Sequence, residues 1–414
     1  MRVLQLGNTD VAGARFNGYD LANRLRERGI DAALAVWRRE STDPHTGALL
    51  DSRAGAWVND AVVRRIENLL SLQSLLYPFA TRLLFDARFR NADLVHAHLL
   101  QTGYFSFFLL PALSRLRPFV WTLHDPWAMT GHCLYALDCG RWETGCGQCP
   151  RLEAPRPLRT DRTAFLWNAK RFLYGASNFD VVVASRWMLR MAQRSPLLKG
   201  ARVHHIPFGL DLDVFRPGDR AAAQRKLGIF PGSLVLGLRA ARSEFKGLPV
   251  ILAALRRLDP GRPVCLVTLD ERGLLDEFRG RFQIVDLGWI DGENAVVGAY
   301  QAMDLFLMPS AAESFGMMAL ESMACGTPVV ACDGTSLPEV LFAPEGGTVV
   351  PQGDAAAFRA AIESLLTNDE ARTSLGRTAR ALAVAHYDIR LHVDRMIALY
   401  EDVAARRKGG ADAP

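Results

Sequence analysis

The chain has 414 residues, of which 49% are apolar and 22% are charged, and its formal net charge is +5. This length exceeds what one hydrophobic core comfortably organises, so we expect a globular protein of two domains. The mild positive charge allows an anionic partner or an acidic membrane surface and requires neither. The first residues lead into an apolar strand without a cleavable signal, and no run of about 18 apolar residues occurs. We therefore expect a cytoplasmic protein without a membrane-spanning segment.

The opening of the chain alternates between strand and helix patterns. Residues 3–6 form an apolar strand, residues 8–13 form a loop that feeds a helix ending near Gly29, and residues 30–37 form a second strand. This order is a βαβ unit, which is typical of a Rossmann-like domain. The loop lacks the pattern G-x-G-x-x-G, so a dinucleotide cofactor is not indicated.

Residues 57–89 combine bulky apolar side chains with several arginines, and the pattern predicts two helices, at residues 62–70 and 72–84. We favour a pair of core helices whose arginines are solvated. The alternative is an interfacial contact with a membrane surface.

Two later strands carry histidines. In the strand at residues 93–98, His96 and His98 share one face, as a metal pair would require, but no third ligand follows at helical spacing. The strand that begins at Phe119 ends in His124. The carboxyl end of a parallel strand is where such sheets bind ligands, so His124 is a candidate site residue, with a structural histidine as the alternative.

Four of the seven cysteines crowd into one irregular stretch rich in glycine and proline, at Cys133, Cys139, Cys146 and Cys149. Four thiolates suit a tetrahedral structural zinc ion, and in a cytoplasmic protein metal is favoured over disulfides. The spacing is not that of a standard zinc finger, so reduced thiols or a redox pair remain the alternatives.

The alternation of helix and strand continues to the end of the chain. Helices are expected at residues 162–174, from Arg186 and at residues 293–303, and strands at residues 179–184, 203–206, 264–269 and 284–287. Residues 215–218 break the regular pattern and mark a crossing between domains. A final helix is expected over residues 389–405, followed by a frayed tail from Arg406.

The most informative stretch follows a buried strand expected at residues 305–308. A helix is predicted at residues 314–325, and Gly326 ends it. Glu313 precedes this helix, where a carboxylate complements the helix dipole, and Glu321 lies about two turns into it. Burying Glu321 would cost several kcal/mol without a polar partner. From this stretch alone, a capping Glu313 and a solvated Glu321 are equally acceptable.

The pattern Glu-x7-Glu from Glu313 to Glu321, followed by Gly-Thr-Pro-Val-Val at residues 326–330, resembles the donor-site signature of the family 4 retaining glycosyltransferases. The segments His-Asp-x-Trp, Thr-Gly-His-Cys and Cys-Gly-x-Cys-Pro after Leu123 are similar to those of bacterial exopolysaccharide glycosyltransferases of the colanic-acid type. The resemblance covers nearly the whole chain. It implies an α/β protein of the GT-B fold, with two facing Rossmann-like domains and a C-terminal helix that crosses back to the first.

The resemblance also implies where the domains lie. Residues 1–210 correspond to an acceptor-side domain, with a cysteine-rich insertion at residues 125–160. Residues 211–388 correspond to a nucleotide-sugar-binding domain, and residues 389–414 to the crossover helix and tail.

On the donor side, the resemblance assigns Glu313 to the transferred sugar and Glu321 to the ribose hydroxyls of the nucleotide. Backbone amides that open the following helix would meet the diphosphate, which agrees with anion capture at a helix N-terminus. These amides belong to Ser314, Phe315, Gly316 and Met317.

A basic loop after the strand that begins at Leu234 is implied to neutralise the same diphosphate. The residues are Arg239 and Lys246, with Arg242 as a substitute because the spacing is slightly long. Fixed cations would stabilise the charge that grows on the leaving phosphate.

In the first domain, the resemblance places His124 beside the donor sugar and makes Asp125 a candidate for acceptor contact or base assistance, with a loop-stabilising role as the alternative. Family members have a Gly-Gly pair at the cleft floor, where this chain offers Ala12-Gly13, so Gly13 carries over only in part. Phe208 stands where the family has Asn, so no side-chain role is implied there.

Together, these features imply a metal-independent retaining hexosyltransferase. It would move a sugar from a GDP- or UDP-linked donor to a lipid-linked glycan acceptor. The reaction would belong to polysaccharide biosynthesis. No cofactor is expected for catalysis. A lipid-linked acceptor would suit peripheral contact with the inner face of the membrane.

Two other classes remain as alternatives. One is another GT-B enzyme, such as a nucleotide-sugar epimerase or a glycan phosphorylase. The other is a non-enzymatic binding module. Nucleic acid is not expected, because the cations do not form one stripe interleaved with aromatic residues.

Overall fold

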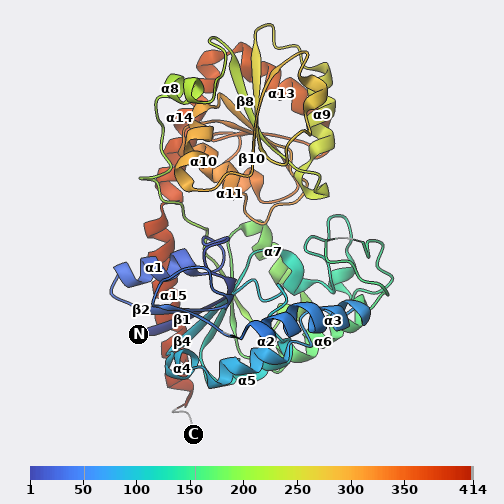
Figure 1. Cartoon of the computed structure of the whole chain (residues 1–414), viewed down its shortest axis with the longest axis vertical. Coiled ribbons are helices and arrows are strands. Elements are labelled where there is room, and N and C mark those ends of the chain that lie inside the picture. Colours follow the sequence, from blue (N-terminus) through green and yellow to red (C-terminus); the bar gives the residue numbers. More distant parts are fainter. Residues whose placement is uncertain (51, 154, 412–414) are drawn as a thin grey trace. The chain divides into compact units, whose positions relative to one another are not determined.

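The computed structural model describes residues 1–50, 52–153 and 155–411, which form two compact units (Figure 1). The first unit contains Met1–Ile206 together with the chain from Val393 onward, and the second contains Pro207–His392. Each unit has its own parallel sheet and its own apolar core. None of the described helices is long and apolar enough to cross a membrane.

The first unit is built on a sheet whose described strands are all parallel, in the order β3-β2-β1-β4-β5-β6-β7. The strands are β1 (Arg2–Thr9), β2 (Asp31–Arg38), β3 (Thr46–Ala48), β4 (Leu94–His98), β5 (Phe119–Leu123), β6 (Asp180–Val183) and β7 (Arg202–His205). Every residue of β4, β5 and β6 is buried, as expected where helices cover both faces of a parallel sheet.

The helices of the first unit vary in length and regularity. They are α1 (Tyr19–Glu27), α2 (Arg53–Trp57), α3 (Arg64–Leu69), α4 (Ala87–Asn91), α5 (Leu110–Leu116), α6 (Thr163–Gly175) and α7 (Arg186–Arg194). A π-helical turn, η1 (Val58–Val63), joins α2 to α3. Short 3₁₀ segments lie at η2 (Pro78–Phe85), η3 (Phe107–Leu109), η4 (Pro126–Met129), η5 (Arg141–Glu143) and η6 (Pro196–Leu198).

The second unit repeats the same plan with the strand order β10-β9-β8-β11-β12-β13, again parallel throughout the described residues. Its strands are β8 (Leu234–Ala240), β9 (Val264–Asp270), β10 (Gln283–Gly288), β11 (Leu305–Met308), β12 (Val329–Cys332) and β13 (Thr348–Val350). Its helices are α8 (Arg220–Lys226), α9 (Leu248–Arg257), α10 (Glu293–Ala302), α11 (Met317–Ala324), α12 (Leu337–Val340), α13 (Ala355–Thr367) and α14 (Asp369–His386), with 3₁₀ turns η7 (Glu244–Lys246) and η8 (Asp276–Phe278).

The central strand β11 shows how this second sheet is covered on both faces. Leu305 and Leu307 belong to the core cluster that also contains residues of α9 and α13. Phe306 points to the opposite face, where its ring meets that of Tyr300 of α10 at 5.4 Å between centroids. Alternating side chains of one apolar strand therefore fill two separate layers, which is the Rossmann-like arrangement. The predicted α/β fold with two Rossmann-like domains is confirmed.

The last helix, α15 (Ile389–Ala411), enters the first unit at Val393. Tyr400 is completely buried, and its hydroxyl lies 2.6 Å from Nδ1 of His96 and 3.2 Å from Nε2 of Gln5. Figure 1 shows this red helix beside the blue strand β1. The prediction of a frayed tail from Arg406 is wrong for the described part, because the helix continues and Arg406 contacts Asp180 at 2.8 Å. Residues 412–414 of that predicted tail lie outside the described residues.

The prediction of a second core helix over residues 72–84 is also wrong. The buried carboxylate of Glu67 accepts hydrogen bonds from the backbone N–H groups of Ser74, Leu75 and Leu76, at 2.6 to 2.9 Å. These bonds fold the chain into a loop directly after α3. An apolar period alone does not reveal a carboxylate that competes for backbone donors.

Candidate active site

Lys246 and Glu313 meet at the carboxyl edge of the second sheet. Lys246 ends η7, which follows β8, and Glu313 lies in the loop between β11 and α11. Lys246 Nζ is 2.5 Å from Glu313 Oε1, and the two side chains are only 20% and 12% exposed. A charge pair this well covered is stable only while both partners are present. The prediction that the basic loop and the glutamate loop converge therefore describes a real contact.

Arg239 and Arg242 differ in their relation to this pair. Arg239 lines the same small cavity as Lys246 and Glu313, and its Nε donates to Asp270 Oδ2 at 2.7 Å. Arg242 is 76% exposed and pairs with Glu271 on the surface. The structure thus brings Arg239 and Lys246 to Glu313 but leaves Arg242 outside the cavity.

The loop before α11 is fixed by one buried hydroxyl. Ser336 donates to the carbonyl oxygens of Glu313 at 3.0 Å and Phe315 at 2.9 Å. Gly316 caps α11 with a φ of 99°, and a Cβ there would lie 2.6 Å from Cδ2 of Leu337. The helix begins at Met317, three residues later than predicted, because this turn requires a left-handed residue. Ser314 and Phe315 therefore belong to the loop.

Phe315 is buried between two aromatic rings of the second unit. Its centroid lies 5.3 Å from that of Phe208 and 5.6 Å from that of Tyr387, both edge to face. Phe208, which departs from the family pattern, thus packs against the glutamate loop. The position supports the loop through ring packing.

Glu321 lies inside the second unit, with 6% of its surface exposed. The hydroxyl of Tyr300, on the neighbouring helix α10, donates to Glu321 Oε2 at 2.9 Å. This contact supplies the polar partner that a buried carboxylate needs. The alternative of a solvated glutamate does not hold.

In the first unit, His124 follows β5 at the carboxyl edge of the sheet. Its Nε2 lies 3.2 Å from Nδ1 of His98, and the Phe16 ring stands edge-on at 5.8 Å. His98 Nε2 in turn lies 2.9 Å from Oε1 of Gln5. Gln5 is a functional candidate that the sequence reasoning missed, and His98 was considered there only as part of a metal pair with His96. The signal was a single glutamine inside an apolar strand.

Asp125 is held by two donors. Its Oδ1 accepts from the backbone N–H of Trp127 at 2.9 Å, and its Oδ2 accepts from Nε2 of Gln101 at 2.8 Å. Burial raises the pKa of Asp125 above its ordinary value. The carboxyl group therefore does stabilise the loop, as the alternative to a catalytic role anticipated.

Gly13 lies exposed in the loop between β1 and α1. It has a φ of 73°, and no described atom lies within 4 Å of where its Cβ would be. The loop is anchored below Gly13 by Asp10, whose carboxylate accepts from the backbone N–H groups of Glu40 and Ser41, both at 2.8 Å. Gly13 is thus a turn glycine whose Cβ position faces open space.

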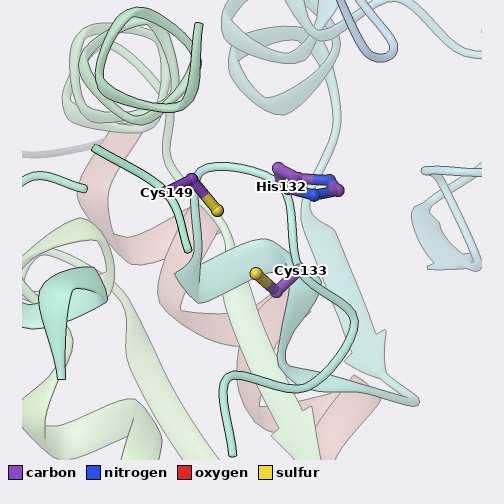
Figure 2. A group of neighbouring side chains, drawn as sticks. All are labelled: His132, Cys133 and Cys149. Atoms are coloured by element: carbon purple, nitrogen blue, oxygen red, sulfur yellow. The ribbon is translucent and has the colours of Figure 1, made fainter. Parts of the chain in front are cut away.

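The cysteine-rich segment gathers potential metal ligands (Figure 2). One ring nitrogen of His132 and the sulfurs of Cys133 and Cys149 all lie within 4.8 Å of one another. Cys139 and Cys146 line the same small cavity. Burial, together with the neighbouring cysteines, raises the pKa of Cys133 to about 12. The sequence pattern predicted the four cysteines and did not point to His132.

Comparisons with known proteins match both halves of the chain. The family described as Glycosyltransferase Family 4 matches residues 16–214, and the family described as Glycosyl transferases group 1 matches residues 219–382. A D-inositol 3-phosphate glycosyltransferase from Mycobacterium marinum is 27% identical over 417 residues, covering 96% of this chain and 82% of that protein. A D-inositol 3-phosphate glycosyltransferase from Saccharomonospora viridis is 36% identical over 225 residues, which cover 50% of this chain and 52% of that protein.

A solved structure shows the same fold. The Anabaena protein Alr3699/HepE, in complex with UDP and glucose, has a TM-score of 0.69 at 16% identity, covering 97% of this chain and 99% of that one. The two family matches adjoin with a gap of a few residues and together span most of the sequence. The chain therefore belongs to the glycosyltransferases of the GT-B fold.

Proposed function

We propose that the protein transfers a sugar from a nucleoside diphosphate donor to an acceptor hydroxyl with retention of configuration and without a catalytic metal. The observation that carries this proposal is the Lys246–Glu313 pair, which lies in the loops bordering β8, β11 and α11. This edge combines cations, a carboxylate and the N-terminal amides of a helix. Those groups suit a diphosphate and a sugar bound side by side.

In the proposed reaction, donor binding breaks the ion pair between Lys246 and Glu313. A diphosphate carries more negative charge than one carboxylate, so Lys246 and Arg239 would turn towards it when the donor binds. Glu313 would then be released to accept hydrogen bonds from the sugar. As the glycosidic bond breaks, negative charge grows on the leaving phosphate, which Lys246 and Arg239 stabilise. The same phosphate oxygen takes the proton of the attacking hydroxyl, so the chain needs no covalent nucleophile.

Replacing Glu313 tests this assignment. Glu313→Ala should reduce kcat by about 100-fold or more, because the contact to the sugar is lost in the transition state. The Kd for the nucleoside diphosphate should stay within a few-fold, since the sugar contact is absent from that ligand. Kinetics and calorimetric titration measure the two quantities.

Two companion variants complete this test. Lys246→Ala should weaken both nucleotide binding and transfer, while Glu370→Ala, an exposed acid of α14, should change neither. A Glu313→Ala protein that loses nucleotide affinity in proportion to its activity would show that Glu313 does not act on the sugar.

The donor base can be found by a thermal-shift screen with UDP-, GDP-, ADP- and TDP-linked sugars and no added metal. A ligand that binds only the folded state raises its stability with the logarithm of its concentration over Kd. A shift with one base identifies the donor. No shift with any of them would favour a non-enzymatic binding module.

For the acceptor, we propose a glycan of polysaccharide biosynthesis, linked to a lipid. The cysteine-rich segment after β5 supports it, because this segment resembles that of exopolysaccharide enzymes. Inositol phosphate is the second candidate, since the two relatives above are named D-inositol 3-phosphate glycosyltransferases. Product formation with a lipid-linked glycan and with inositol 3-phosphate, measured side by side, separates the two.

We propose that the helical stretch from α2 to α3 contacts the membrane in which such an acceptor lies, at the cytoplasmic face. Trp57 and Leu69 are 65% and 61% exposed, and Arg64 and Arg65 lie between them. Exposed apolar side chains beside arginines suit an anionic lipid surface. Co-sedimentation with anionic vesicles, lost in the variant Trp57→Ser/Leu69→Ser, would support the contact, and equal binding of that variant would contradict it.

A further inference from the structure

The segment from Thr130 to Pro150 contains little regular structure, yet it closes around a cavity of about 20 Å³. All four cysteines line this cavity, and it is about large enough for one water-sized sphere. The sulfurs of Cys133 and Cys149 approach within 4.8 Å (Figure 2). Zinc bound tetrahedrally at about 2.3 Å from each thiolate holds its sulfurs roughly 3.8 Å apart, so small rotations bring these two into range.

The backbone around Cys146 adopts an unusual turn. Gly145, Cys146, Gly147 and Gln148 have φ values of 125°, 57°, 88° and 47°. The left-handed conformation costs a non-glycine residue about 1 to 2 kcal/mol. Hydrogen bonds from Arg141 Nη1 to the carbonyl oxygen of Gly147 at 3.1 Å and to Oε1 of Gln148 at 3.2 Å, and from the N–H of Gly147 to Oγ1 of Thr163 at 2.9 Å, hold this turn beside the cavity. In addition, the N–H of Gly131 donates to the sulfur of Cys146 at 3.3 Å.

His132 has other contacts. Its Nε2 lies 3.2 Å from the carbonyl oxygen of Arg151, and its Nδ1 lies 3.4 Å from Nε2 of Gln73. Gln73 in turn accepts from the indole of Trp127 at 2.9 Å. Both ring nitrogens therefore face partners of the protein, although one of them lies near the two sulfurs.

A buried lysine lies close to the segment. Lys170 is 3% exposed, and its Nζ donates to the carbonyl oxygens of Trp127 at 2.7 Å and Thr130 at 2.8 Å. Burial lowers the pKa of Lys170 well below its ordinary value. An ion held by four thiolates carries a net charge of about −2, which would favour the charged form of this lysine. The surroundings thus suit a negatively charged metal cluster.

We propose that Cys133, Cys139, Cys146 and Cys149 bind one Zn²⁺ as four thiolates, with His132 beside the ion and not bound to it. The role of the ion is structural, because four protein ligands leave no position for substrate. It closes a loop whose regular structure, among the described residues, is limited to the 3₁₀ turn η5. The ion thereby fixes the segment that follows His124 and Asp125.

The experiment measures the metal and its ligands directly, on the full-length protein. Elemental analysis of protein purified without chelator should give about one zinc per chain. After exchange with Co²⁺, the absorption spectrum should show the sulfur-to-metal charge transfer and the strong visible bands of a four-thiolate tetrahedral site. Neither readout depends on glycosyl transfer, so failure of this proposal is distinguishable from failure of the proposed function.

Variants define the ligand set. Cys149→Ser and Cys139→Ser should each lower zinc content at least about tenfold under a competing chelator. His132→Asn and Cys265→Ala, the latter within buried strand β9, should keep both the zinc and the cobalt spectrum. Because wild-type protein carries the main readout, a variant that fails to fold does not leave the question open.

Three results would overturn the proposal. The first is protein that holds neither zinc nor cobalt after reconstitution with reduced thiols. The second is a disulfide within the cluster, found by mass spectrometry of unreduced protein. The third is a cobalt spectrum of mixed nitrogen and sulfur ligation that disappears in His132→Asn.

Discussion

The resemblance assigns Glu321 to the ribose of the nucleotide, and this assignment can be tested at the level of one side chain. Its carboxylate is buried, and the Tyr300 hydroxyl occupies one of its oxygens. Glu321→Gln keeps the shape and can still accept from Tyr300, but it loses the charge. We expect nucleoside diphosphate affinity to fall by about 10- to 100-fold, since hydrogen bonds to a charged group contribute about 1.5 to 3 kcal/mol each. Calorimetric titration gives the Kd.

Tyr300→Phe is the matched control for Glu321. It removes the hydroxyl that positions the carboxylate and leaves the charge in place. A weakening of only a few-fold is expected. Unchanged affinity in Glu321→Gln would show that the carboxylate serves only the packing between α10 and α11.

At the scale of single residues, the sequence pointed to Lys246 and Glu313 in the second unit and to His124 in the first, and it missed Gln5. Lys246 and Glu313 lie in loops whose motifs are local, so their positions could be assigned from the pattern. The contact between Gln5 and Tyr400 joins residues 395 positions apart. No local pattern carries that information, since it depends on which helix covers which strand.

At the scale of elements, Gly247 determines the path between η7 and α9. Its φ is 69°, and a Cβ would lie 2.0 Å from the carbonyl oxygen of Pro309. Gly247→Ala should therefore displace the backbone beside Lys246 and disturb its pair with Glu313. We expect a loss of about 2 to 4 kcal/mol in the free energy of unfolding and weaker nucleotide binding. Urea unfolding and titration measure these quantities.

Gly228 provides the comparison. It has a similar φ of 67°, but no described atom lies within 4 Å of its Cβ position. Gly228→Ala should cost only about 1 kcal/mol and leave nucleotide binding unchanged. If the two variants behave alike, the approach to Pro309 does not control the Lys246 loop.

The order of elements was predictable because parallel strands are continuous apolar runs separated by amphipathic helices. Two of the boundaries that failed involve a side-chain hydrogen bond to the backbone. Glu67 redirects the backbone after α3, and Ser336 holds the loop whose left-handed turn at Gly316 delays the start of α11. Hydrogen bonds of this kind are set by tertiary position, which no hydrophobic period encodes.

At the scale of the whole molecule, the two units have separate cores, and the two proposed ligands bind different units. Calorimetry should therefore show two unfolding transitions. A nucleoside diphosphate at about 100 times its Kd should raise only that of Pro207–His392, by roughly 5 to 10 °C. A zinc chelator should lower only the other transition.

The result that opposes this view is a single transition that responds to both reagents. It would mean that the units unfold as one cooperative body. Assigning each transition with the Cys149→Ser and Lys246→Ala variants provides the control.

The return of α15 to the first unit has a consequence for protein synthesis. Met396 and Tyr400 are completely buried, and the hydroxyl of Tyr400 contacts Gln5 and His96, which lie early in the chain. The ribosome must add the whole of Pro207–His392 before these side chains exist, which takes roughly 10 to 40 s at about 5 to 20 residues per second. During that interval the surface around Gln5 and His96 lacks its final cover. The second unit can therefore complete its fold on the ribosome before the first, in reverse of the order in which they are translated.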